Sequence, residues 1–143
     1  LARRQGEPRR ALKEVLGNAS RGRLAIGDPR FVPAGRHAQT LLESQGLWET
    51  SPDLLVVGGH VAAVLAYLQS GGVDGAIVYA TDIHNRPELA GEALPQDTLV
   101  RPRVVGASVR GGRRSHQVRG FLRFIQSEDG QRILQAHGFG PLV

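Results

Sequence analysis

The fold of this chain follows from one stretch, Arg23-Leu-Ala-Ile-Gly-Asp-Pro-Arg-Phe-Val-Pro-Ala-Gly-Arg36. Its apolar residues 24–27 predict a short buried strand, and Asp28-Pro29 predicts the turn that ends it. Val32-Pro33-Ala34-Gly35 then opens an amphipathic helix, because apolar residues recur at helical spacing through Leu42. A helix start leaves backbone N–H groups unpaired and carries a partial positive charge. The stretch therefore predicts a strand–turn–helix unit whose helix start can hold an oxyanion.

The rest of the chain continues the alternation of short strands and helices. Short loops between these segments favour parallel βαβ units, so we expect an α/β fold with a mainly parallel sheet and flanking helices. The predicted strands are 24–27, 54–57, 75–79 and 104–109, and the predicted helices are 9–16, 35–45, 61–69, 117–125 and 130–137.

Three of the predicted elements point to one functional edge. In open α/β sheets, ligands bind beyond the carboxyl ends of the strands, where helix starts converge. Ala34, Val61 and Tyr79 each come just after such a strand end. We therefore expect these three positions to lie near one another at the same edge of the sheet.

Composition excludes several classes of site. Cysteine is absent, which excludes disulfides and thiolate ligands. The net charge is +5, and two groups of arginines stand out, one in an N-terminal tail and one in residues 110–119, neither with interleaved aromatic residues. This pattern is typical of a solvated surface rather than of a specific nucleic-acid site. The chain has no apolar run near the roughly 18 residues that cross a bilayer.

The polar residues do not form a catalytic set. Asp28 and Asp82 are interpreted as single turn or cap carboxylates, and Ser115 and Ser127 as helix caps. The five histidines are scattered and lack zinc-ligand spacing, so we expect no metal cation site. Without an acid–base pair or an activated nucleophile, the chain is not expected to be an enzyme.

Several segments, taken in order, identify a family resemblance. They are Gly27-Asp28-Pro29 with Val32-Pro33-Ala34-Gly35, then Gly59-His60-Val61-Ala62, then the buried strand and its end in residues 73–82, and the helical residues 121–139. As a set, they resemble the periplasmic molybdate-binding proteins of ABC importers, which have the type 2 periplasmic-binding-protein fold. The resemblance extends from about Arg21 to Leu142.

The resemblance implies a ligand and its contacts. It implies that the backbone N–H groups of Ala34 and Val61 and the hydroxyl of Tyr79 contact molybdate or tungstate, with Pro33, Gly35 and His60 in supporting positions. No cofactor is implied, and the metal enters only as the oxyanion. The implied partner is an ABC permease, and the implied location is the periplasm. Neutral donors suit this task because they select a fully deprotonated anion by shape and by the number of its acceptors.

The resemblance also implies an organisation. Family members bind the anion between two lobes, so residues 23–109 are expected to form the second lobe after a basic segment, residues 1–22. Residues 110–143 are expected to form the C-terminal helices that pack on a first lobe, which is expected to be missing. A half-site would then bind the anion weakly, and apolar side chains of the C-terminal helices would favour self-association.

Two histidines lie near the expected site but are not counted among its ligand donors. His37 stands where the family usually has tyrosine, and we expect it to lie off the donor cluster. His60 and His37 are both interpreted as surface histidines, although either could respond to pH or donate to an anion.

Two other functions stay open. The same fold could be a small-anion-sensing effector domain of a transcriptional regulator, which would be cytoplasmic. Alternatively, the chain could bind polyanions non-specifically through its basic surface, which would give a steep salt dependence.

Overall fold

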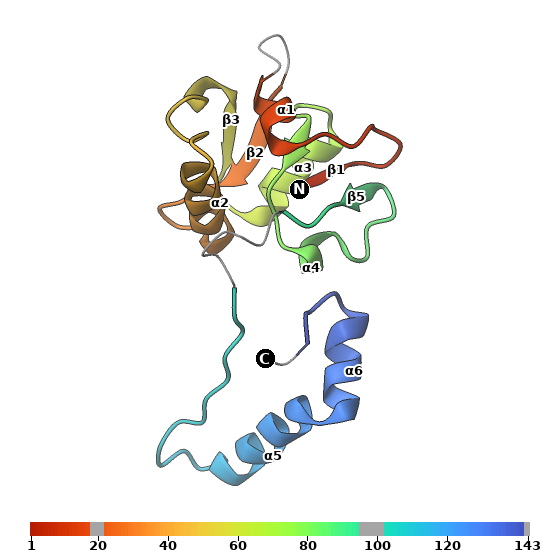
Figure 1. The fold of residues 1–143 in the computed structure, drawn as a ribbon. Helices are drawn as coiled ribbons and strands as arrows, with labels where there is room; N and C mark the ends of the chain where they lie inside the picture. Colours follow the sequence, from red (N-terminus) through yellow and green to blue (C-terminus); the bar gives the residue numbers. More distant parts are fainter. Residues whose placement is uncertain (18–21, 95–101, 142–143) are drawn as a thin grey trace. The chain divides into compact units, whose positions relative to one another are not determined.

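The computed structural model describes residues 1–17, 22–94 and 102–141 (Figure 1). The chain forms two compact units, residues 1–101 and 102–143. This division differs from the boundaries expected at 22/23 and 109/110. Residues 1–17 belong to the first unit, because they contribute a strand and a helix to its sheet and core.

The first unit contains a mixed five-stranded sheet with the order β3-β2-β4-β1-β5. Strands β2 (Leu24–Gly27), β3 (Leu55–Gly58) and β4 (Gly75–Ala76) are parallel neighbours. Strands β1 (Ala2–Arg4) and β5 (Leu89–Gly91) pair in antiparallel fashion at the other side of the sheet. The predicted α/β fold with flanking helices is therefore confirmed, but the sheet is mixed rather than mainly parallel, with two parallel and two antiparallel pairings between the described strands.

Strand β1 does not follow from its own sequence, which is short and rich in arginine. It forms because Ala2 pairs with both Ala76 and Gly91 and is almost fully buried between the two strands. The guanidinium of Arg4 donates to the carbonyl oxygens of Leu68 and Val73, at 2.8 Å and 3.0 Å. The neighbouring elements, rather than local propensity, thus make this segment a strand.

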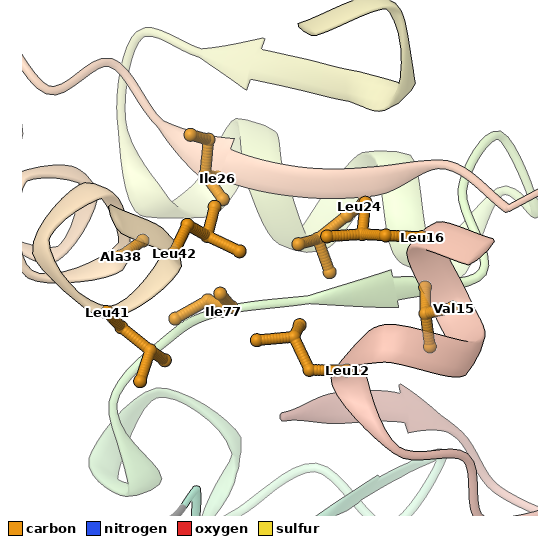
Figure 2. Close-up of a cluster of buried hydrophobic side chains, with 9 residues drawn as sticks. All are labelled: Leu12, Val15, Leu16, Leu24, Ile26, Ala38, Leu41, Leu42 and Ile77. Carbon is orange, nitrogen blue, oxygen red and sulfur yellow. The ribbon is translucent and has the colours of Figure 1, made fainter. Parts of the chain in front are cut away.

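Helices cover both faces of the sheet (Figure 1). Helices α1 (Leu12–Gly17) and α2 (Pro33–Ser44) pack on one face, and α3 (Val61–Gln69) packs on the other. Figure 2 shows the first core, in which side chains from β2 meet those of both helices. This core contains Leu12, Val15, Leu16, Leu24, Ile26, Ala38, Leu41, Leu42 and Ile77.

Strand β2 is buried on both faces, which explains its continuous apolar run. Leu24 and Ile26 point into the core of α1 and α2, whereas Ala25 points into the core of α3. Successive side chains of a strand alternate between faces, so both sets must be apolar when both faces are covered. Because β2 lies between β3 and β4, it fixes the position of the turn that follows it and of the start of α2.

Some predicted boundaries need correction. The third strand is shorter than the predicted 75–79, because β4 ends at Ala76 and residues 77–79 lead to the short helix α4 (Ala80–Ile83). A 3₁₀ turn, η1 (Pro52–Leu54), precedes β3. The α3 boundaries agree with the predicted 61–69, and α2 begins two residues before the predicted 35.

The second unit contains α5 (Ser115–Gln126) and α6 (Glu128–Ala136). The prediction of a strand over 104–109 is wrong, because these residues are exposed and pair with no described strand. Three valines in six residues do not form a strand without a partner to complete its hydrogen bonds. Ser127 caps α6 as predicted, whereas Ser115 lies inside α5, which begins after Arg114. Among the described residues, the helices are too short or too polar to span a bilayer.

Candidate functional site

The carboxyl ends of three parallel strands lie at one edge of the first unit's sheet. The register pairs Gly27 of β2 with Gly58 of β3. Beyond the strands, the Asp28 N–H donates to the Gly58 carbonyl oxygen at 2.8 Å, and the Ile77 N–H donates to the Ala25 carbonyl oxygen at 3.0 Å. Because these bonds extend the pairing past the strand ends, the segments that start α2, start α3 and carry Tyr79 all leave the sheet at this edge.

The start of α2 presents an unpaired backbone donor. Pro33 is the first helical residue and has no N–H. The N–H groups of Gly35 and Arg36 donate to the Val32 carbonyl oxygen, at 2.9 Å and 3.1 Å. Within residues 1–17, 22–94 and 102–141, no acceptor is paired with the Ala34 N–H. The Ala34 N–H, which the sequence predicted as a ligand donor, is therefore free to bind a ligand.

Gly35 lets the start of α2 approach the end of β2. A Cβ atom at this position would lie 2.1 Å from the Gly27 carbonyl oxygen, closer than real Cβ contacts allow. The helix start is therefore held against the strand end by direct backbone packing. This contact fixes the direction of the N-terminal N–H groups of α2.

A local ion pair neutralises the turn between β2 and α2. The carboxylate of Asp28 accepts from the Arg30 backbone N–H at 2.9 Å and from its guanidinium at 2.7–3.2 Å. These hydrogen bonds, with the side-chain bonds contributing most, lower the pKa of Asp28. The Arg30 guanidinium also lies over the Phe31 ring, 5.3 Å from its centroid. Asp28 is therefore a turn carboxylate, as predicted, and the turn adds little net charge to the edge.

The start of α3 provides a second set of free backbone donors. His60 is the N-cap, and its Nδ1 accepts from the Ala63 N–H at 3.1 Å. The His60 carbonyl oxygen accepts from Ala63 and Val64, so the N–H groups of Val61 and Ala62 have no acceptor in the part of the chain that the structure describes. His60 is exposed, in agreement with its interpretation as a surface histidine, and it stabilises the helix start.

Tyr79, in the segment after β4, contacts α2 through its side chain. Its backbone N–H donates to the Asp82 carboxylate at 2.9 Å, which fixes the start of α4. Its hydroxyl lies 2.8 Å from Nδ1 of His37 on α2, and the two rings are T-shaped with centroids 5.8 Å apart. The expectation that His37 lies off the donor cluster is therefore wrong. His37 is in the second turn of α2, and its ring reaches the hydroxyl across the gap between the two elements.

The Tyr79 hydroxyl is held in its protonated form. Burial raises the pKa of Tyr79, the Asp82 carboxylate raises it further, and Arg36 lowers it in part. A neutral phenol has one proton to donate. This hydroxyl and the backbone N–H groups of Ala34 and Val61 are all neutral donors, on segments that leave the sheet at the same edge. Among the described residues, no group of three or more His, Asp or Glu side chains could hold a metal cation.

Sequence reasoning missed two of these contacts. The Asp28–Arg30 pair is local, and the Asp-Pro-Arg spacing is a signal that could have indicated it. The His37–Tyr79 contact joins residues 42 positions apart, and the sequence contains no signal for it.

Known proteins resemble this chain in both sequence and fold. The family model for bacterial extracellular solute-binding proteins matches residues 2–140. The molybdate-binding protein ModA of Haemophilus influenzae is 30% identical over 116 residues, which cover 81% of this chain and 46% of that protein. The resemblance found from the ordered segments of the sequence is thereby confirmed.

Two solved structures share the fold. A substrate-binding domain from Clostridium difficile superposes with a TM-score of 0.82 at 24% identity, covering 99% of this chain and 62% of that domain. The periplasmic molybdate-binding protein of Azotobacter vinelandii gives a TM-score of 0.66 at 18% identity, covering 92% of this chain and 58% of that protein. The chain spans about half the length of the curated relatives it matches, 45% and 46% for two of them.

Proposed function

The chain belongs to the family of bacterial extracellular solute-binding proteins, and on this premise we propose that it binds molybdate or tungstate for import by an ABC transporter. One observation carries the proposal. Three segments leave the sheet at one edge: the start of α2, the start of α3 and the segment that carries Tyr79. The backbone N–H groups of Ala34 and Val61 are unpaired donors there. A 30% identical relative is a molybdate-binding protein, and molybdate matches this donor chemistry.

Neutral donors suit a tetrahedral oxyanion. Two helix starts each contribute a partial positive charge, and the hydroxyl adds a directed hydrogen bond. Each such bond contributes about 1 kcal/mol net, and somewhat more to a charged acceptor. In the proposed site, Pro33 and Gly35 shape the start of α2, and His60 caps α3 so that Val61 stays free. Three donors occupy only part of the acceptor capacity of four oxygens, so the rest of the shell comes from other groups.

The proposed role places the protein outside the cytoplasm, with an ABC permease as its partner. The support is the family description and the periplasmic relative from Azotobacter vinelandii. The ligand is cargo rather than a cofactor, and the proposal assigns no catalytic step to any residue.

A titration followed by NMR tests the site directly, even when binding is weak. Molybdate is added to the ¹⁵N-labelled chain, and the backbone amide signals are followed at constant ionic strength. We expect the largest shifts at the Ala34 and Val61 amides, with smaller effects from sulfate. Shifts centred on the arginines of residues 110–119, or a response that disappears at moderate salt, would instead indicate non-specific anion binding.

Substitution of Tyr79 by phenylalanine tests the hydroxyl donor. Tyr79→Phe keeps the ring and removes the hydroxyl, so we expect molybdate binding to weaken by about 1–3 kcal/mol, roughly five- to 150-fold in Kd. Tyr67→Phe is the matched control, because Tyr67 is the other tyrosine of the chain and is exposed on α3. Equal affinities for the two variants would remove Tyr79 from the site.

A further inference from the structure

The Tyr79 hydroxyl has one proton to donate but two potential hydrogen-bond acceptors. It lies 2.8 Å from His37 Nδ1 in the structure, and in the proposed site it also donates to the oxyanion. In a neutral imidazole one ring nitrogen donates and the other accepts. Because a phenol is a better donor than an imidazole N–H, the arrangement expected in the free protein has the Tyr79 hydroxyl donating and Nδ1 of His37 accepting.

Binding of an oxyanion reverses these roles. Once the hydroxyl proton points at the anion, only lone pairs of the phenol oxygen face His37. An unprotonated Nδ1 at 2.8 Å would then face those lone pairs without a hydrogen between them, which is repulsive. The contact is satisfied only when Nδ1 carries a proton and donates it to the Tyr79 oxygen.

From this geometry we propose that His37 is a positioning residue for the oxyanion donor Tyr79, and that its Nδ1 changes from acceptor to donor when the anion binds. The inference rests on the proposed function. Two routes supply the Nδ1 proton, a shift of the neutral imidazole to its other tautomer or the uptake of one proton from solvent. In the second route, the imidazolium also places a positive charge beside the bound dianion.

Imidazole is the side chain whose charge changes near neutral pH, so the charged groups beside the pair matter for a pH test. The charged groups that interact electrostatically with Tyr79 are Arg36 from α2 and Asp82 from α4. Guanidinium and carboxylate groups keep their charges across the range in which imidazoles titrate. The other histidines of this unit are His60, the cap of α3, and His84 at the end of α4. Substitution of His60 separates its contribution from that of His37, and the Nδ1 signal of His37 itself separates that of His84.

The direction of the pH dependence follows from the proton balance. When the Nδ1 proton comes from solvent, the bound state holds one proton more than the free state, whereas the tautomer shift takes up none. Molybdate affinity therefore rises as the pH falls through the imidazole range, by up to about tenfold per pH unit, the limit for one proton. At higher pH the affinity levels off, because the tautomer route no longer depends on pH.

Two substitutions of His37 separate positioning from general structural support. His37→Gln places an amide oxygen and an amide N–H near the hydroxyl without a titrating group, so we expect binding with a flat pH profile. His37→Phe keeps an aromatic ring against Tyr79 and removes the hydrogen bond, so we expect weaker binding, also with a flat profile. His60→Asn keeps the cap of α3 and should retain the wild-type pH dependence.

The test combines ¹⁵N NMR of the imidazole nitrogens with molybdate titrations between pH 6 and 8 on the whole chain. We expect Nδ1 of His37 to be an acceptor in the free protein and protonated in the molybdate-bound protein. Binding that leaves Nδ1 unchanged, a free protein with Nδ1 already protonated, or an unaltered pH profile in His37→Gln would overturn the inference alone. Absence of any molybdate response in the wild-type chain would overturn the proposed function, and the inference with it.

Discussion

At the residue scale, the candidate site depends on backbone groups that close contacts at two glycines hold in place. Gly35 permits the contact between α2 and β2, because any Cβ there would lie 2.1 Å from the Gly27 carbonyl oxygen. Gly58 has a similar role at β3, where a Cβ would lie 2.8 Å from Cγ2 of Val64. Ala34 and Val61 contribute through N–H groups, so their side chains carry little information about function.

Substitution of Gly35 tests this contact. Gly35→Ala forces α2 away from β2, so we expect the free energy of unfolding to fall by about 1–3 kcal/mol or more, as in other overpacked sites. The measurement is urea denaturation followed by circular dichroism. Gly17→Ala is the control, because a Cβ at the end of α1 meets no atom of the described residues within 4 Å. Equal stability of the two variants would contradict the close contact.

At the scale of elements, the turn between β2 and α2 links stability to pH. Asp28 is nearly buried and accepts hydrogen bonds from both the side chain and the backbone of Arg30. These bonds lower the pKa of Asp28 in the folded protein. The ionised carboxylate therefore stabilises the folded state at neutral pH, and protonation at acid pH removes that contribution.

A comparison with Asp28→Asn measures this linkage. The contribution is fully present above the ordinary aspartate pKa of about 3.9 and is lost as the pH falls through the lower folded value. We therefore expect the stability difference between wild type and Asp28→Asn to be constant from neutral pH to about pH 5 and to shrink below pH 4. Urea denaturation at a series of pH values gives this difference. A difference that stays constant down to pH 2 would show that the carboxylate charge is irrelevant to the turn.

At the scale of the whole molecule, the two units differ in how far they bury their apolar side chains. The first unit buries two continuous cores on the faces of its sheet. In the second unit, Phe121, Phe124 and Ile133 are 61%, 47% and 51% exposed. Gly130 brings α5 and α6 close together, since a Cβ there would lie 2.1 Å from the Phe124 carbonyl oxygen. The pair of helices is therefore compact but leaves an apolar surface uncovered.

This surface predicts self-association. We expect the weight-average mass in light scattering to rise with concentration, because association removes exposed apolar side chains from water. The double variant Phe121→Ser/Phe124→Ser should reduce that rise. Phe31→Ser is a matched control, since Phe31 is 74% exposed in the first unit. A mass that stays monomeric at every concentration, or a larger effect of Phe31→Ser, would contradict this assignment.

The sequence by itself determined the parts of the molecule that depend on local patterns. The strand at 24–27, the boundaries of α3 and the free helix starts at Ala34 and Val61 follow from apolar periodicity and from the placement of proline and glycine. The cap role of Ser127 also follows from local chemistry. Such features are decided within a few residues, so a single sequence contains their full signal.

Only the tertiary structure decided the features that need a distant partner. Residues 2–4 become β1 because β4 and β5 offer them hydrogen bonds, whereas the more β-prone residues 104–109 pair with no described strand. His37 joins the site because packing of α2 on the sheet brings its ring to Tyr79. Strand formation and side-chain pairing both require complementary groups from elsewhere in the chain, and only the packed fold brings those groups within hydrogen-bonding distance.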